Sequence, residues 1–144
     1  MIVLDANVLV YAYNSASEHH ARCRAWLEAA LNGPQQIGFP WQTLLAFVRI
    51  ATHPRVFRQP LLIAEAVAIV DEWLTCPQAI LVAPGEDHWS LLKRQLVDGQ
   101  ASGALVPDAA LAALALERGA TLCSTDRDFA RFRALKLVNP IAAD

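Results

Sequence analysis

The sequence predicts an α/β fold, a single domain with an open, mostly parallel sheet flanked by helices. Short apolar segments alternate along the chain with longer segments in which apolar residues recur at helical spacing. Alternating strands and helices are typical of parallel sheets joined by right-handed crossovers. A length of 144 residues suits one domain, so we expect residues 1–144 to form a single unit.

The chain begins with an apolar run that ends at an acid. Residues 1–4 are apolar and include β-branched members, and Asp5 is followed by Asn7 and a second apolar run. This pattern predicts a buried strand that ends at Asp5 and turns into a helix. Because ligands of open α/β sheets bind beyond the carboxyl ends of the strands, Asp5 is expected on the floor of the site.

Later segments predict helices because their apolar residues fall on one side of a helix, or because Ala and Leu predominate. The first follows residues 15–18, which resemble a capping box, and the next opens at Pro40. The Ala- and Leu-rich helix covers residues 109–116 and ends before Gly119, and a short helix is expected around Phe129. The apolar stripes are Cys23, Trp26, Leu27, Ala30 and Leu31; Trp41, Leu44, Leu45 and Val48; Leu62, Ala66, Val67, Val70, Trp73 and Leu74; and Trp89, Leu92 and Leu96.

Further short apolar runs predict the remaining strands. They comprise residues 36–39, 79–83, 120–124 and 135–138, the last as an edge strand. Each run is bounded by Gly, Pro or polar residues, as strands of a buried sheet commonly are. Since helices connect parallel strands, the carboxyl ends of these strands should gather on one rim of the sheet.

The composition is that of a protein that does not cross a membrane. Hydrophobic residues make up 55% of the chain, yet Arg, Asp, Pro or Gly interrupts every apolar run before the length of about 20 residues that a membrane span needs. The chain starts without a basic segment or a signal cleavage site, so a cytoplasmic location is expected. The net charge of −2 provides no general attraction for nucleic acid, which would have to be bound by local patches and metal ions.

Three cysteines are present, Cys23, Cys76 and Cys123. They are far apart in the sequence and form no CxxC pair, so they do not indicate a zinc site. Buried free thiols are the simpler expectation.

Carboxylates follow two of the predicted strands and open one helix. Asp5 and Asp126 lie at the ends of different strands, and Asp108 lies at the start of the helix that precedes the second strand. If they meet on one rim, their repulsion must be relieved by protonation or by a cation. A site of carboxylates without His or Cys indicates Mg²⁺, or Mn²⁺, rather than zinc.

Each acid also has a structural explanation. Asp108, Thr125, Asp126 or Asp128 could serve as a helix N-cap, a role worth about 1 kcal/mol. Asp5 is harder to explain in this way, because an acid between two apolar runs is unfavourable unless something binds it.

Together, these motifs resemble a known family. Residues 5–9 (Asp-Ala-Asn-Val-Leu), residues 107–109 (Pro-Asp-Ala) and residues 124–129 (Ser-Thr-Asp-Arg-Asp-Phe) resemble PIN domains, and more narrowly the VapC-type toxins of bacterial toxin–antitoxin pairs. The resemblance covers essentially the whole chain. It implies a Mg²⁺- or Mn²⁺-dependent ribonuclease that acts on single-stranded or looped RNA, forms a dimer and is neutralised by a small antitoxin.

Carried over by position, the resemblance assigns the acidic site to Asp5, Asp108 and Asp126, with Asn7, Thr125 and Asp128 as the surrounding polar groups. The sequence departs from the family at Phe47, where many PIN domains carry a glutamate, and this raises the question of whether a second metal can bind. Candidate contacts to RNA are Arg22, Arg24, Arg49 and Arg55. The last two belong to a cationic group with His53 and Arg58, which could equally be a solvated helix end.

Two other functional classes fit the sequence less well, and one alternative stays open. A haloacid-dehalogenase-like phosphatase needs an acid where Asn7 stands, and a receiver domain needs a lysine after its last strand, whereas Lys136 lies within a predicted strand. The main alternative is a degenerate PIN-like domain that binds RNA or a protein without cleavage.

Overall fold

The structure, a computed structural model, describes residues 1–142, and its strands form the predicted parallel sheet. The strands are β1 (Ile2–Leu4), β2 (Ile37–Pro40), β3 (Ala79–Val82), β4 (Thr121–Cys123) and β5 (Lys136–Val138). Their order is β3-β2-β1-β4-β5, and each neighbouring pair is parallel. The predicted strands are therefore confirmed, with bounds that shift by one or two residues.

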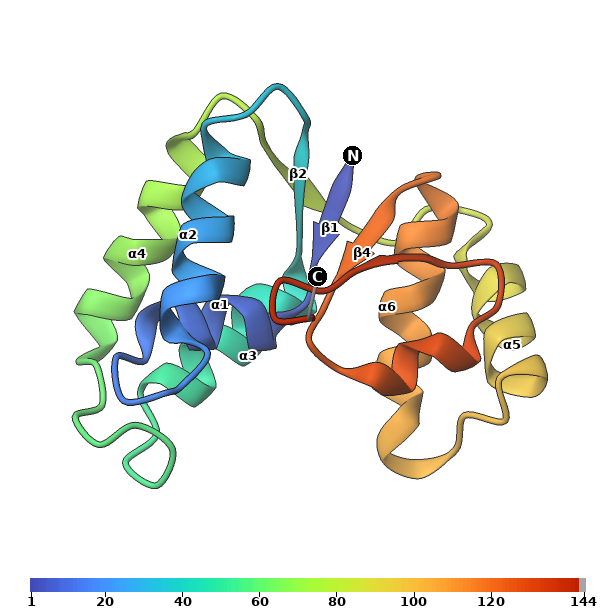
Figure 1. Cartoon of the computed structure of the whole chain (residues 1–144). Coiled ribbons are helices and arrows are strands. Elements are labelled where there is room, and N and C mark those ends of the chain that lie inside the picture. The colour runs from blue at the N-terminus through green and yellow to red at the C-terminus, as the bar shows by residue number, and fades with distance from the viewer. Residues whose placement is uncertain (143–144) are drawn as a thin grey trace.

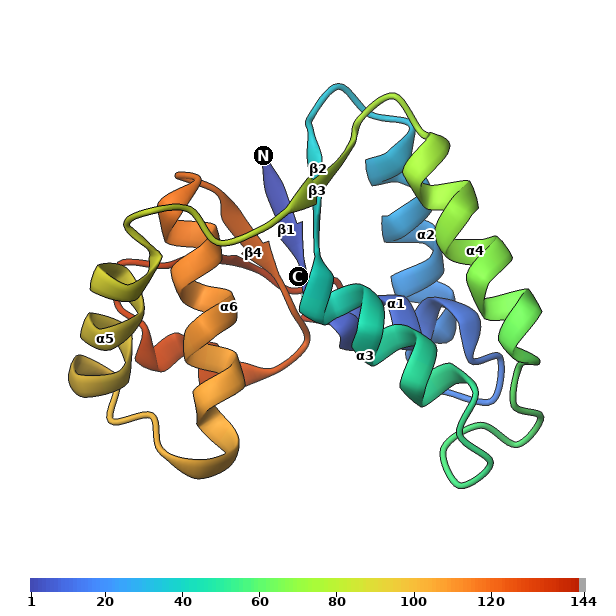
Figure 2. The same cartoon turned by 180° about the vertical axis from the view of Figure 1, so that it is seen from behind.

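Helices cover both faces of this sheet, as predicted (Figures 1 and 2). One side carries α1, α2, α3 and α4, and the other carries α5, α6 and the 3-10 helix η2. A second 3-10 helix, η1, precedes α6. The helices are α1 (Ala6–Tyr13), α2 (His20–Leu31), α3 (Trp41–Ala51), α4 (Ile63–Thr75), α5 (His88–Asp98), η1 (Gly103–Leu105), α6 (Val106–Glu117) and η2 (Arg127–Arg131).

Two apolar cores lie on opposite faces of the sheet, because successive residues of a strand point to opposite sides. Leu4 and Cys123 belong to the core beneath α1 to α4. Val3 and Leu122, their neighbours in the same strands, belong to the core beneath α5 and α6. All four are fully buried, so β1 and β4 are covered on both faces, as the near-continuous apolar runs predicted.

An aromatic cluster holds α4 and α3 against the sheet. Trp73 stacks on Phe39 of β2, with ring centroids 5.6 Å apart, and meets Phe47 of α3 edge-on at 4.7 Å. Its indole N–H donates a hydrogen bond to the Tyr13 hydroxyl at 3.2 Å. Such contacts join the carboxyl ends of α1 and α3 to α4.

The connections place a topological switch point between β1 and β4. The chain runs from β1 to β2 and β3 on one side, then crosses to β4 and β5 on the other. Ligands of open α/β sheets bind in the crevice at this point, beyond the strands' carboxyl ends. Asp5 directly follows β1 and Asp126 follows β4, and the register pairs Leu4 with Cys123.

Some local predictions are wrong. The capping box at residues 15–18 does not form, because these residues lie before α2, which begins at His20 with His19 as its N-cap. The expected short helix around Phe129 is present, as a 3-10 helix. All three cysteines are free, as expected, but Cys76 is only partly buried.

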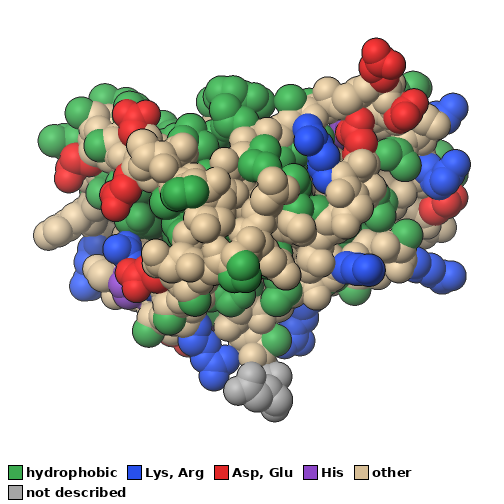
Figure 3. Space-filling model, turned by 90° about the horizontal axis from the view of Figure 1, so that it is seen from above, with side chains coloured by type: hydrophobic (Ala, Val, Ile, Leu, Met, Phe, Trp, Pro, Cys, Tyr) green, Lys and Arg blue, Asp and Glu red, His purple; other side chains and the backbone are tan. Residues whose placement is uncertain are grey.

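None of the helices within residues 1–142 is both long and apolar enough to cross a membrane. Figure 3 views the molecule from the end where the strands begin, opposite the strands' carboxyl ends. On this face the acidic side chains lie toward the left and right sides of the view rather than over its middle. The acids that follow β1 and β4 belong to the opposite rim.

Candidate active site

Asp5 occupies the position directly after the central strand, and both of its carboxylate oxygens are bonded. Oδ1 accepts a hydrogen bond from the Ala6 N–H at 2.7 Å, so the side chain caps α1. Oδ2 accepts a hydrogen bond from the Ser124 hydroxyl at 2.7 Å, across the junction of β1 and β4. The local turn and the neighbouring strand together fix this carboxylate at the rim.

The Ser124 hydroxyl is the centre of a network that the sequence analysis missed. Besides donating to Asp5, its oxygen accepts hydrogen bonds from Asn7 Nδ2 at 3.2 Å and from the Asp126 N–H at 3.0 Å. Asn7 Oδ1 accepts from the Thr125 N–H at 3.2 Å. The contact made by Thr125 is therefore through its backbone, and the side chain that positions the acid is Ser124. The sequence feature that could have identified Ser124 is its position, as a polar residue directly after an apolar strand.

The remaining acids come from the turn after β4 and from the start of α6. Asp126 is the N-cap of η2, where Oδ1 accepts a hydrogen bond from the Asp128 N–H at 2.9 Å. Asp108 lies in the first turn of α6 but is not its N-cap, a position held by Leu105. The capping explanation thus applies to Asp126 and fails for Asp108, whose carboxylate makes no hydrogen bond within residues 1–142.

Burial and mutual repulsion raise the pKa of two of these acids. Burial is the largest cause for Asp5, and the charge of Asp126 raises its pKa further against the hydrogen bonds from Ser124 and Ala6. Burial and then the charges of the other three acids raise the pKa of Asp108 to about 6. The charge of Arg131 opposes this shift. The acids predicted to meet therefore lie near enough for their charges to interact.

The donor set fits a hard divalent cation. Within residues 1–142, no three His, Cys, Asp or Glu side chains are gathered into a ready-made metal cage. Mg²⁺ needs no such cage, because it keeps several waters and takes one or two carboxylates. Asp5, Asp108 and Asp126 offer only oxygen, and no ion pair neutralises them in the described part of the chain. Repelling carboxylates of this kind suit Mg²⁺ or Mn²⁺.

Phe47 does not border the acids. It is fully buried in the aromatic cluster, edge-on to Trp73 and with its ring centroid 5.7 Å from that of Tyr13. The family resemblance places the absent glutamate at this position, but a side chain here points into the core. The expectation is corrected because the periodicity of α3 directs position 47 toward α4.

Two other residues of α3 reach the acidic rim. The Thr43 hydroxyl donates to the Leu4 carbonyl oxygen at 2.7 Å, and Gln42 Nε2 donates to the Pro107 carbonyl oxygen at 3.3 Å. Ala46 follows one turn later on this side of the helix. Since α3 contains no acid, the negative charge at the rim comes from the four aspartates.

The arginines considered for RNA contact divide into two pairs. Arg24 donates to Glu28 at 2.8 Å, and Arg22 donates to backbone carbonyl oxygens near the end of the described chain. Arg49 and Arg55 are exposed, and their guanidinium groups make no hydrogen bond or ion pair within residues 1–142. Only the second pair is free to bind a phosphate without breaking an existing interaction.

The chain and its fold have counterparts among known proteins. The sequence profile of the PIN domain matches residues 2–135. The chain therefore belongs to the PIN-domain family. Its relatives within the family bear the name VapC. Ribonuclease VapC37 of Mycobacterium tuberculosis is 45% identical over 142 residues, which cover 99% of each chain. Ribonuclease VapC43 of the same species is 41% identical over 98% of this chain and 96% of that one.

Solved structures share the fold at lower identity. A toxin–antitoxin complex from Klebsiella pneumoniae matches with a TM-score of 0.66 and 17% identity, covering 99% of this chain and 100% of that one. VapC20 of Mycobacterium tuberculosis, described as a toxin that cleaves the sarcin-ricin loop, matches with a TM-score of 0.65 and 17% identity over 92% of this chain and 95% of that one. These likenesses support the fold.

Proposed function

We propose that this protein is a metal-dependent endoribonuclease and the toxin of a toxin–antitoxin pair, which hydrolyses RNA phosphodiester bonds at the acidic rim with Mg²⁺ or Mn²⁺. Family membership and the names of the relatives support the class of activity. The observation that carries the proposal is the bridge between acids of two neighbouring strands. Ser124 bonds both Asp5 and the backbone of Asp126 at the switch point of the sheet.

The chain's own residues would prepare this site. Asp5, Asp108 and Asp126 would hold the cation, one or two of them directly and the rest through its waters, and Asp128 would add negative charge. When bound, the cation supplies Lewis acidity and lowers the pKa of a coordinated water. The Ser124 hydroxyl keeps the Asp5 carboxylate in one orientation, as groups behind a metal ligand commonly do.

The test is cleavage of a structured RNA by purified protein. We expect cleavage with Mg²⁺ or Mn²⁺ and none in excess chelator. Asp5→Asn and Asp108→Asn should abolish cleavage while far-UV circular dichroism stays that of the parent, because asparagine retains the shape of the side chain. Cleavage that persists in both variants and in chelator would come from another site or a contaminant.

The degenerate, non-cleaving PIN-like domain is the alternative, and metal binding separates the two. A competent site gains thermal stability from its cation by linkage, so Mn²⁺ should raise the melting temperature of the parent. The same titration should leave Asp108→Asn nearly unchanged. RNA binding without cleavage and without a metal-dependent shift would favour the alternative.

The proposal includes a partner antitoxin, since one protein of the same fold was solved as a toxin–antitoxin complex. An antitoxin that covers the acidic rim would keep RNA from it. We therefore expect co-expression with the cognate antitoxin to suppress cleavage, and a cytoplasmic location for both proteins.

Homodimerisation is also proposed, through an apolar surface on α3 and α4. Trp41, Leu45 and Val67 are 53%, 68% and 48% exposed, and they line an almost wholly apolar groove of about 190 Å³. Exposed apolar patches of this kind mark protein interfaces. We assign this surface to a second copy of the chain.

A further inference from the structure

A second pocket, of about 410 Å³, lies between the carboxyl-terminal end of α5 and η2, outside the acidic rim. Its charged residues are Arg94 and Asp98 of α5, Arg131 of η2, and Arg133 just after η2. Three cations face one anion, so the pocket is locally positive in a chain whose net charge is −2.

Two of these arginines are unpaired in the described part of the chain. Arg94 and Arg133 are exposed, and their guanidinium groups make no hydrogen bond or ion pair within residues 1–142. Asp98 lies in the same pocket without coming within ion-pair distance of either of them. By contrast, Arg24 is occupied by Glu28. The pocket therefore presents free guanidinium groups to a ligand.

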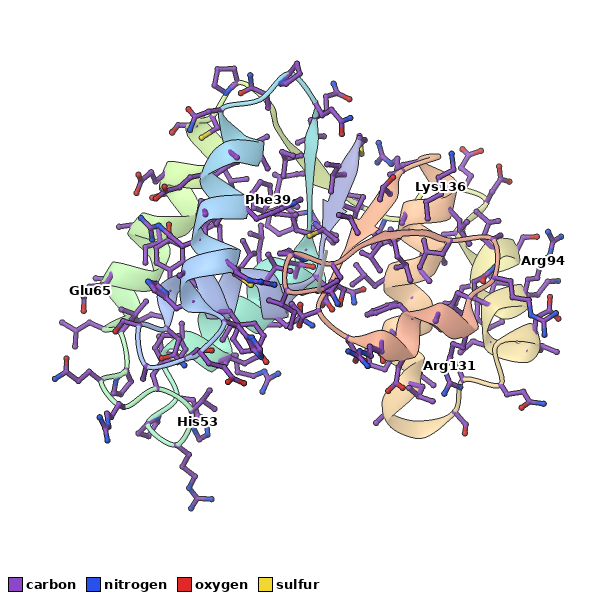
Figure 4. The ribbon with its side chains drawn as sticks, viewed as in Figure 1. Phe39, His53, Glu65, Arg94, Arg131 and Lys136 are labelled. Carbon is purple, nitrogen blue, oxygen red and sulfur yellow. The ribbon has the colours of Figure 1, made fainter. Side chains whose placement is uncertain are left out.

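Arg131 lines this pocket, and its charge also reaches the acidic site. Its Nη1 donates to the carbonyl oxygens of Gly99 at 2.9 Å and Gln100 at 3.3 Å, which ties η2 to the turn that leads toward α6. Its charge also acts on Asp108 in the first turn of α6. Figure 4 shows Arg94 and Arg131 on neighbouring elements of the same part of the molecule. A ligand in the pocket would thus lie beside the acidic site.

We propose that this pocket binds a backbone phosphate of the RNA on one side of the bond that is cleaved. The inference rests on the proposed function and extends it with a substrate-binding subsite. Guanidinium groups pair with phosphate oxygens through two parallel hydrogen bonds, which gives both affinity and orientation. Because the catalytic rim is itself acidic, a polyanion needs such local cations to dock.

The test compares RNA affinity at different lengths. Arg94→Gln with Arg133→Gln removes both free guanidinium groups, and Arg131 stays intact because it holds the Gly99–Gln100 turn. Fluorescence anisotropy in chelator, where metal-dependent cleavage cannot occur, measures binding of a dinucleotide and of a longer single-stranded RNA. We expect about threefold to tenfold weaker binding of the longer RNA, and a salt dependence shallower by roughly 0.7 for each phosphate that the variant no longer binds. Dinucleotide binding should not change.

The matched control is Lys93→Gln with Lys136→Gln. It removes the same charge from exposed positions that do not line the pocket, and Figure 4 shows Lys136 far from Arg131. The control should bind the longer RNA like the parent. Equal weakening in both double variants, weakening with the dinucleotide as well, or no weakening at all would overturn the inference.

The two proposals fail separately. A parent that never cleaves RNA but loses long-RNA affinity in the pocket variant would refute the activity and retain the subsite. A parent that cleaves RNA but binds it equally well in the pocket variant would refute the subsite alone. A competition experiment distinguishes the RNA chain from free phosphate as the ligand. If inorganic phosphate displaces the longer RNA no better than chloride does at equal ionic strength, and the pocket variant binds that RNA more weakly, the ligand is the RNA chain.

Discussion

At the scale of single residues, Ser124 links two of the acidic positions at the rim. One hydroxyl bonds Asp5, Asn7 and the backbone of Asp126, so it joins the ends of two strands that are far apart in the sequence. In the proposed site its role is to position Asp5 rather than to touch the reacting groups. Outer contacts of this kind affect metal affinity through the orientation of the ligand.

Ser124→Ala should therefore weaken Mn²⁺ binding by about tenfold. It should also lower the free energy of unfolding by about 1–3 kcal/mol, because the partly buried Asp5 carboxylate loses a donor. Isothermal titration calorimetry and urea unfolding measure the two effects. Ser90→Ala, at an exposed position of α5, is the control and should change neither. Parent-like metal affinity in Ser124→Ala would contradict the positioning role.

A second residue-scale prediction concerns pH. The pKa of Asp108 is raised from 3.8 to about 6, so between these values the folded protein binds more protons than the unfolded chain. Stability of the metal-free protein must then fall as the pH rises through this window. The raised pKa of Asp5 acts in the same direction. Melting temperatures measured in chelator across this range should decline, and Asp108→Asn should flatten the decline.

Metal binding should depend on pH in the opposite sense and become tighter as the pH rises, because the cation competes with the proton for the same carboxylates. Mn²⁺ affinity should weaken as the pH falls through about 6, the pKa of Asp108. Titrations above and below this pH measure the change. Affinity independent of pH in the parent would mean that Asp108 does not contact the cation.

At the scale of elements, the aromatic cluster determines how α3 and α4 sit on the sheet. Trp73 is 1% exposed and contacts β2, α3 and α1 in turn. Trp89, on α5, is 64% exposed. The sequence pattern does not distinguish the two residues, since each belongs to an apolar stripe.

Trp73→Ala should lower the free energy of unfolding by about 3–5 kcal/mol, because it leaves a large cavity and frees the Tyr13 hydroxyl from its donor. Trp89→Ala should change it by no more than about 0.5 kcal/mol. Urea unfolding followed by circular dichroism makes the comparison. Similar destabilisation in both variants would show that α5 packs more tightly than its exposure indicates.

At the scale of the whole molecule, the apolar surface on α3 and α4 predicts self-association. Leu45→Asp places a charge at its centre and should convert a dimer into a monomer, as measured by light scattering after size exclusion. Val97→Asp is the control, because Val97 is 74% exposed but lies on α5. A parent that is monomeric at micromolar concentration would remove the proposed interface.

The positions of the acids on the strands and helices could be predicted from local sequence. Asp5 stands out because an acid directly follows an apolar strand, and Asp108 because it opens a strongly helical segment. Phe47 and Ser124 could not be assigned, since the side of α3 that meets the acids and the pairing of β1 with β4 both depend on contacts between distant segments. The capping box failed for a different and local reason, because α2 begins only at His20.

The sequence by itself determined the alternation of strands and helices and the positions of the acids at their ends. These features follow from the periodicity of apolar residues over a few turns or pairs of residues, which is local information. The tertiary structure alone decided which apolar residues are core and which are surface, as with Trp73 and Trp41. It also decided that one hydroxyl joins Asp5 to the backbone of Asp126, and that two arginines unpaired within residues 1–142 line a pocket formed by α5 and η2. Each of these depends on which faces pack together across the whole chain, and periodicity within one element does not contain that information.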